Sequence, residues 1–150
     1  MNLFRLEMAS TTRIYAPLAT VWDVFSDIRR WTDWCDVCDR AGVEEDFDWR
    51  VGQEIWLKFR MASVSVPFHV QLDEVSPHQS VAWSSTKFTV TAVRTFTFEE
   101  SSPGEVTVTD HKLFTSPVLP LRTFYPRPVI RRMTESMLAS LKAECERIAP

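Results

Sequence analysis

Residues 127–148 read R-P-V-I-R-R-M-T-E-S-M-L-A-S-L-K-A-E-C-E-R-I. Apolar residues recur there every three or four positions, at Ile130, Met133, Met137, Leu141, Cys145 and Ile148. This spacing predicts an amphipathic α-helix from Pro128 to Ile148, about 31 Å long. Because its apolar side needs a partner surface, we expect a curved sheet folded around this helix, with a cavity between the two.

The rest of the chain supplies that sheet. Residues 53–61 alternate apolar and polar side chains, and residues 64–72 repeat the alternation. Pro67 cannot donate to a β-ladder, so the second of these strands should lie at an edge or bulge there. The other expected strands cover residues 6–15, 37–45, 80–85, 88–99 and 105–114. Alternation in the strand at residues 88–99 places Phe88 on the inward side.

Helical patterns precede and follow the strands. Residues 17–26 and 28–34 predict two short helices after the first strand, and a short helical piece is expected around residues 118–124. Ser101-Ser102-Pro103-Gly104 predicts a hairpin loop before the last strand. The fold class is therefore α+β, in the order strand, two helices, six strands, long helix.

Composition and charge limit the classes of function. A chain of 150 residues fits one domain covering 1–150, and its net charge of -3 argues against a general nucleic-acid binder. Residues 121–150 carry six Lys or Arg against three acids, whereas residues 1–120 carry eleven against seventeen. This basic end is either a solvated helix face or a docking face for an anionic surface.

The sequence also suggests a location. It has no apolar run near the length of a membrane span and no charged-then-apolar start, which predicts neither a transmembrane helix nor a signal peptide. Three cysteines, an odd number, suggest reduced thiols in a cytoplasm. Eighteen aromatic residues against three glycines permit a pocket lined with rigid rings.

The order of elements, with several loose motifs, resembles the START-like ligand-binding superfamily. This superfamily includes the birch-pollen-allergen-like proteins, the lipid-transfer START domains and the bacterial polyketide cyclase/dehydrase-like proteins. The motifs are Ala16-Pro17 before Val21-Trp22, then Asp27, Trp34, Gly52, the strand at 106–109, and Leu141-Lys142 with Glu144.

The resemblance covers nearly the whole chain and implies a helix-grip fold, a seven-stranded antiparallel sheet wrapped around the long C-terminal helix. Members mostly bind lipids, polyketides, sterols or quinones in a hydrophobic cavity, and a minority catalyse cyclisation or dehydration. Many small bacterial members have Gly between the last strand and the helix, where this chain has Ser116-Pro117 and three further prolines. The mouth of the cavity should therefore differ from theirs.

Arg94 and Asp110 are the expected polar anchors for a ligand head group. Alternation puts Arg94 on the inward side, and a pairing of Phe96 with Val108 would set Arg94 across from Asp110. Because burying either charge alone is costly, the two side chains should meet. The alternative is an ion pair at the solvent rim of the sheet, since a slip of one residue reverses the faces.

The strand histidines and the pair of nearby cysteines are not expected to form a hydrolytic or metal site. His69 falls on the polar side of its strand, and His111 should point away from the cavity if Asp110 points in. Cys35-Asp36-Val37-Cys38 has the spacing of a redox or half-zinc motif, but we interpret it as adventitious because further ligands at suitable spacing are missing. No metal site and no cofactor is predicted.

We therefore predict a carrier or sensor of a hydrophobic small molecule (lipid, polyketide or quinone-like), monomeric or weakly dimeric. One alternative is a cyclase or dehydratase acting on a polyketide-like substrate, with Arg94, Asp110 or His111 as proton-transfer groups. Another is a membrane-visiting lipid carrier whose contact patch is Leu119, Leu121, Phe124, Arg122, Arg127, Arg131 and Arg132. The residues expected to bind the ligand are Trp34, Leu57, Phe59, Met61, Val66, Phe68, Val70, Trp83, Val90, Arg94, Phe96, Val108, Asp110, Phe124, Met133, Met137 and Leu141.

Overall fold

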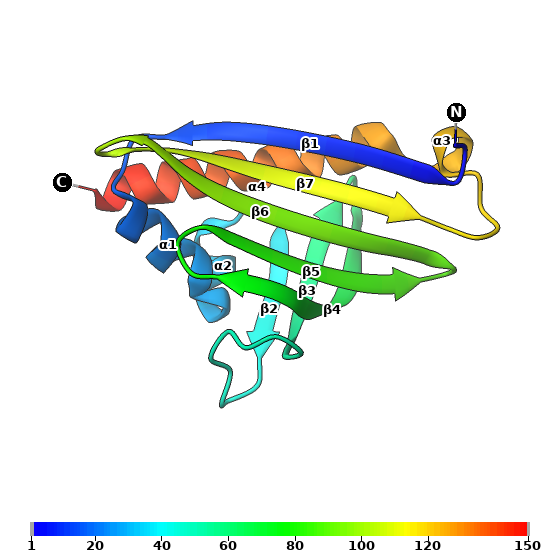
Figure 1. Cartoon of the computed structure of the whole chain (residues 1–150), viewed down its shortest axis with the longest axis horizontal. Coiled ribbons are helices and arrows are strands. Elements are labelled where there is room, and N and C mark those ends of the chain that lie inside the picture. Colours follow the sequence, from blue (N-terminus) through cyan, green and yellow to red (C-terminus); the bar gives the residue numbers. More distant parts are fainter. Residues whose placement is uncertain (1, 150) are drawn as a thin grey trace.

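The computed structural model describes residues 2–149 and contains a seven-stranded antiparallel sheet wrapped around a long helix (Figure 1). The strand order is β1-β7-β6-β5-β4-β3-β2. The strands are β1 (Arg5–Ile14), β2 (Cys38–Val43), β3 (Glu54–Met61), β4 (Val64–Ser76), β5 (Ser80–Lys87), β6 (Val90–Ser102) and β7 (Glu105–Thr115). The helices are α1 (Leu18–Ser26), the 3-10 turn η1 (Ile28–Arg30), α2 (Trp31–Trp34), α3 (Leu121–Phe124) and α4 (Arg127–Ile148). The expected α+β helix-grip fold is confirmed.

Helix α4 lies along the concave side of the sheet, and β2, β3 and β4 turn steeply away from β1 and β7 (Figure 1). It begins at Arg127, one residue before the predicted start, with Pro128 in its first turn, where a missing N–H costs no helical bond. Its apolar stripe is buried from Ile130 to Cys145. Ile148 is 48% exposed, so the expectation that the stripe continues to that residue is wrong.

Strand β4 pairs with a different neighbour in each half. Residues 64–71 pair with β3 and residues 71–76 pair with β5, so Gln71 alone takes part in both described ladders. Within the described chain, β5 has no ladder to the half that contains Pro67, so the missing N–H of Pro67 is tolerated there. The predicted edge at Pro67 is therefore confirmed, and the ladder irregularity lies between Leu72 and Glu74.

Phe88 does not belong to a strand. Lys87 pairs with Val90, and the two residues between them have positive φ, 50° at Phe88 and 68° at Thr89. A two-residue hairpin turn needs this geometry to match the twist of its strands. The ring of Phe88 is therefore carried outward and is 85% exposed, so its predicted inward position is wrong.

Buried apolar side chains form two clusters. The larger, the aromatic core, packs rings from α1, α2, β5 and β6 against the second half of α4: Trp22, Phe25, Trp31, Trp83, Phe96, Phe98, Met137 and Leu141 are among its members. The smaller, the entrance cluster, comprises Leu6, Met8, Val90, Phe114, Leu121 and Ile130. It lies where α3 and the first turn of α4 meet β1, β6 and β7.

Candidate ligand-binding site

A cavity of about 360 Å³ lies between the sheet and the start of α4, and its wall is drawn from both clusters. Strands β3 to β7 supply most of the wall, and Pro126, Ile130 and Met133 close it from the helix. Most of the lining side chains are apolar. The predicted site residues that line it are Leu57, Phe59, Met61, Val66, Phe68, Val70, Trp83, Val90, Arg94 and Met133.

The structure places the other seven predicted residues elsewhere. Phe96, Val108, Met137 and Leu141 have no exposed surface and pack within the aromatic core, because rings from α1 fill that end of the interior. Asp110 lies behind the cavity wall, held by two cations.

Trp34 and Phe124 lie further away. Trp34 lines a separate surface hollow with Asp27 and Glu144, because α2 ends on the far side of the aromatic core. Its indole Nε1 is buried and has no hydrogen-bond acceptor among the described residues. Phe124 is 69% exposed at the end of α3.

Sequence reasoning missed part of the wall. The alternation that puts Asp110 inward also puts Lys112 and Phe114 inward, and every second residue of β7 from Val106 to Phe114 is buried. That signal was available in the sequence. The missed residues are Ser85, Lys87, Phe88, Ala92, Val93, Lys112, Phe114, Leu119, Tyr125, Pro126 and Ile130.

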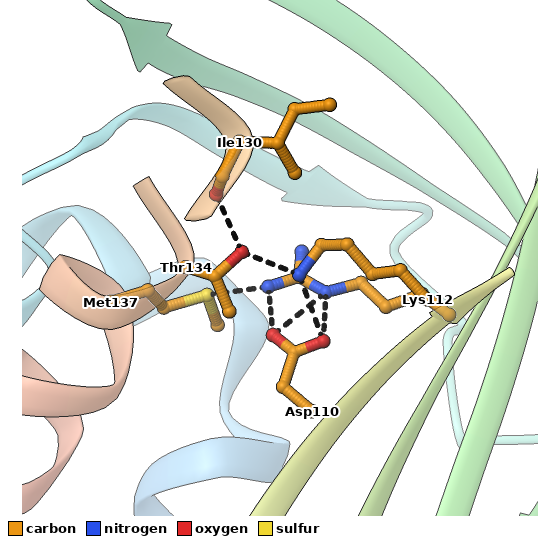
Figure 2. A network of polar contacts seen from close by, with 6 residues as sticks. Asp110, Lys112, Ile130, Thr134 and Met137 are labelled. Carbon is orange, nitrogen blue, oxygen red and sulfur yellow. Dashed lines mark hydrogen bonds and ion pairs between the residues drawn. The ribbon is translucent and has the colours of Figure 1, made fainter. Parts of the chain in front are cut away.

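A buried ionic network joins β6, β7 and α4 beside this cavity (Figure 2). Arg94 donates from Nε to both carboxylate oxygens of Asp110 at 3.1 Å, and from Nη2 to Oδ2 at 2.6 Å. Arg94 is 8% exposed and Asp110 1%, so the contact is present and the solvent-rim alternative is wrong. The guanidinium also lies 4.6 Å from the centroid of the Phe96 ring.

The pairing of β6 with β7 differs from the expected register. Phe96 pairs with Asp110, and Arg94 pairs with Lys112. Arg94 therefore reaches Asp110 diagonally, over the distance that a long side chain spans between next-but-one neighbours. The expected pairing of Phe96 with Val108 is wrong by two residues, a shift that keeps the same faces inward.

Lys112 completes the network. Its Nζ donates to Asp110 Oδ1 at 2.9 Å and to Thr134 Oγ1 at 2.6 Å, and Thr134 in turn donates to the carbonyl oxygen of Ile130 at 2.8 Å (Figure 2). Met137 contributes its Sδ, 3.2 Å from Arg94 Nη2. One buried carboxylate thus accepts hydrogen bonds from both Arg94 and Lys112.

The pKa values of two members shift in consequence. Burial alone would raise the pKa of Asp110, but Arg94 and Lys112 outweigh it and hold that pKa below its usual range. Burial, reinforced by the charge of Arg94, lowers the pKa of Lys112 to about 7, against the pull of Asp110. Lys112 therefore titrates near neutral pH.

Neither strand histidine faces the cavity. His111 points outward as expected, with Nε2 3.0 Å from Glu7 Oε2. His69 is on the exposed side of β4, 3.2 Å from Glu54. Of the three proton-transfer candidates, only Arg94 lines the cavity, and His111 is on the opposite face of the sheet.

The Cys35 and Cys38 thiols are both buried. Burial raises the pKa of Cys35 to about 11 and that of Cys38 to about 12. Because the thiolate is the reactive form, both thiols are poor nucleophiles at neutral pH.

The rim of the cavity carries exposed apolar side chains. Phe88 lies at the rim, Val118 precedes α3 and is 67% exposed, and Phe124 ends α3 and is 69% exposed. Arg122, Arg127, Arg131 and Arg132 are exposed on α3 and α4. Leu121 belongs to the entrance cluster with no exposed surface, so its predicted place in a contact patch is wrong. No helix within residues 2–149 is long and apolar enough to cross a bilayer.

Comparison with known proteins identifies the family. The sequence profile of the polyketide cyclase / dehydrase and lipid transport family matches residues 5–146, so the chain belongs to this family. The resemblance inferred from the sequence is confirmed. No curated protein matches the sequence.

Solved structures share the fold at low identity. The ZhuI aromatase/cyclase from Streptomyces sp. R1128 is 16% identical over 95% of this chain and 94% of its own, with a TM-score of 0.80. A START superfamily protein from Mycobacterium smegmatis is 11% identical over 95% and 99%, with a TM-score of 0.77. Major latex-like protein 151 from Panax ginseng is 9% identical over 95% and 98%, with a TM-score of 0.80. At these identities the likeness shows the fold alone.

Proposed function

We propose that the protein binds a hydrophobic small molecule, of lipid, polyketide or quinone-like chemistry, as a carrier or sensor. The apolar body of the ligand occupies the cavity, and a polar group faces Arg94 and Lys112. One observation carries the proposal: an apolar cavity whose buried end presents two cations. A volume of about 360 Å³ falls in the range typical of small-molecule sites.

The polar end favours a ligand that accepts hydrogen bonds. Arg94 and Lys112 are donors only, and Asp110 already accepts from both. The N–H groups of Arg94 and Lys112 that are not bonded to Asp110 or Thr134 can then donate to a ligand carbonyl, hydroxyl or carboxylate oxygen. A purely hydrocarbon guest would leave these donors without acceptors, which costs binding free energy.

Native mass spectrometry of freshly purified protein tests the proposal, because a trapped guest reveals its mass directly. A second measurement titrates the protein with a fluorescent fatty acid and compares wild type with Arg94→Met. The matched control is Arg132→Met, an arginine on the exposed side of α4. We expect weaker binding only for Arg94→Met. Equal affinity in all three proteins would exclude the anchor role, and no binding in wild type would overturn the proposed function.

A cyclase or dehydratase is the second candidate function, favoured by the buried Arg94–Asp110–Lys112 network at the cavity wall. A lysine that titrates near pH 7 beside a carboxylate is suited to proton transfer. Turnover of a poly-β-ketone substrate would establish this activity, whereas stoichiometric binding without product would support the carrier.

Membrane contact is a third candidate, favoured by the exposed Phe88, Val118 and Phe124 beside exposed arginines. Cosedimentation with anionic vesicles at low salt tests it. Loss of cosedimentation in Phe88→Ser/Phe124→Ser would support this surface, and protein that stays in the supernatant in wild type would exclude it.

A further inference from the structure

Lys112 is a buried lysine at the wall of an apolar cavity. Its side chain is 7% exposed, and it lines the cavity together with Arg94, Phe114 and Met133. Only three other lysines occur in the chain, Lys58, Lys87 and Lys142. A buried amine needs a structural or chemical reason, because burial of an ammonium group is costly.

The hydrogen bonds of Nζ fit a neutral amine. Asp110 Oδ1 and Thr134 Oγ1 each accept one N–H, and Thr134 uses its own proton on the carbonyl of Ile130. A neutral amine has two N–H groups, and both then have acceptors. An ammonium has a third, which finds no acceptor within residues 2–149. In the neutral form one position of the tetrahedral nitrogen, the lone pair, is left without a protein partner.

The charges around Nζ favour the same form. Arg94 on β6 and Asp110 on β7 are the charged groups that shift its pKa, and α4 contributes the uncharged Thr134. With burial, they bring the pKa to about 7, which leaves about half of the amine neutral at pH 7. A lysine desolvated in an apolar pocket beside a second cation is an activated nucleophile.

We propose that Lys112 forms a reversible imine with the aldehyde or ketone group of a ligand held in this cavity. The inference rests on the proposed binding function and specifies the reactive group of the ligand. The Nζ lone pair forms a bond to the carbonyl carbon, and the C=O π electrons move to the oxygen. Nζ gives up its two protons, both of which end on that oxygen, and the C–O bond breaks to release water. The product is a C=N bond to Lys112, and no oxidant or reductant takes part.

Reductive trapping tests this proposal. Wild-type protein is incubated with 2-naphthaldehyde, an apolar aromatic aldehyde, and sodium cyanoborohydride, which reduces imines to stable amines. Peptide mapping then measures the adduct at each of the four lysines. At pH 7 we expect labelling of Lys112 to exceed that of Lys58 by about tenfold or more, since an ordinary lysine has a pKa near 10.4 and is almost fully protonated. Labelling of Lys112 should rise through pH 7 and level off by about pH 8.5, and labelling of an ordinary lysine should keep rising.

Two controls make the outcome decisive. Lys142→Met removes a lysine that does not line the cavity and should leave the adduct at Lys112 unchanged, whereas Lys112→Arg keeps a cation and should remove that adduct. Binding of the probe is followed separately by quenching of tryptophan fluorescence. A bound probe with no preference for Lys112 would overturn the imine and leave the proposed function intact. A probe that neither binds nor labels, together with no binding of the fluorescent fatty acid, would overturn both.

Discussion

The two ends of the sheet's concave face are built from the same strands and the same helix, yet one is filled and the other is hollow. At the filled end, Phe25 inserts between Phe96 and Phe98 of β6, with ring centroids 4.8 Å and 5.0 Å away. At the hollow end, β6 presents Val90 and Ala92 instead. The size of the inward-facing side chains of β6 therefore decides where the packed core ends and the cavity begins.

The covering elements differ in the same way. Over the filled end, α1 buries Val21, Trp22 and Phe25 against the sheet. Over the hollow end, the chain forms the single turn α3 among prolines, and only Leu121 is buried from it. The prolines around α3 limit it to a single turn, so it covers less of the sheet than α1 does. The same sheet and helix thus form a packed core at one end and a cavity at the other, because different segments of the chain cover the two ends.

The largest effect expected from this contrast is in the filled end. Phe25→Ala should lower the free energy of unfolding by about 3–5 kcal/mol, because it removes a fully buried ring and leaves a cavity. Met133→Ala, in the wall of the hollow end, should cost about 2 kcal/mol, because that side chain already borders empty space. Urea unfolding of both variants measures the difference. Equal losses would show that the two ends are packed alike.

The next effect concerns the charges between the two ends. Asp110→Asn should lower the free energy of unfolding by about 3 kcal/mol, because Arg94 would then be a buried cation without a counter-ion and Lys112 would lose an acceptor. Adding Lys112→Met should restore part of that loss, because it removes the buried amine that has lost its acceptor. If the double variant is less stable than Asp110→Asn alone, the network is not organised by charge.

A third effect, smaller per pH unit, follows from the titration of Lys112. Its pKa is about 7 in the folded chain and near 10.4 in an unfolded one, so the unfolded state binds more protons between these values. Stability should rise with pH across that window, by at most about 1.4 kcal/mol per pH unit, and be level below pH 7. The difference in free energy of unfolding between wild type and Lys112→Met isolates this contribution. A difference that does not change from pH 7 to pH 10 would contradict it.

The smallest effect lies at the rim of the hollow end, and its sign is opposite. Phe88→Asn should raise the free energy of unfolding by about 0.5 kcal/mol, because Asn tolerates the positive φ of this turn better than an aromatic residue. The same substitution removes the exposed ring at the rim. Thermal denaturation without the fluorescent fatty acid measures the effect of the substitution on stability, and denaturation with it measures the effect of losing the rim ring on ligand binding. A melting temperature below that of wild type without ligand would refute the predicted stabilisation.

Local patterns determined most of the fold. The spacing of Met133, Met137, Leu141 and Cys145 specifies a helix with one apolar side, and strict alternation in β3, β4 and β7 specifies half-buried strands. The inward position of Asp110 also follows from alternation, and with it the contact to Arg94. These features depend on residues close together in the chain, which is why the sequence alone predicts them.

Only the tertiary structure decided which inward residues line a cavity and which fill a core. Phe96 and Met137 have the same periodicity as Val90 and Met133, but Phe25 from a distant helix packs against Phe96, whereas Val90 and Met133 line the cavity. The two-residue shift in the β6–β7 register set Lys112 opposite Arg94 without changing either face. The extent of the cavity and the register of the ionic network depend on contacts between different segments of the chain, and periodicity within one segment does not determine them.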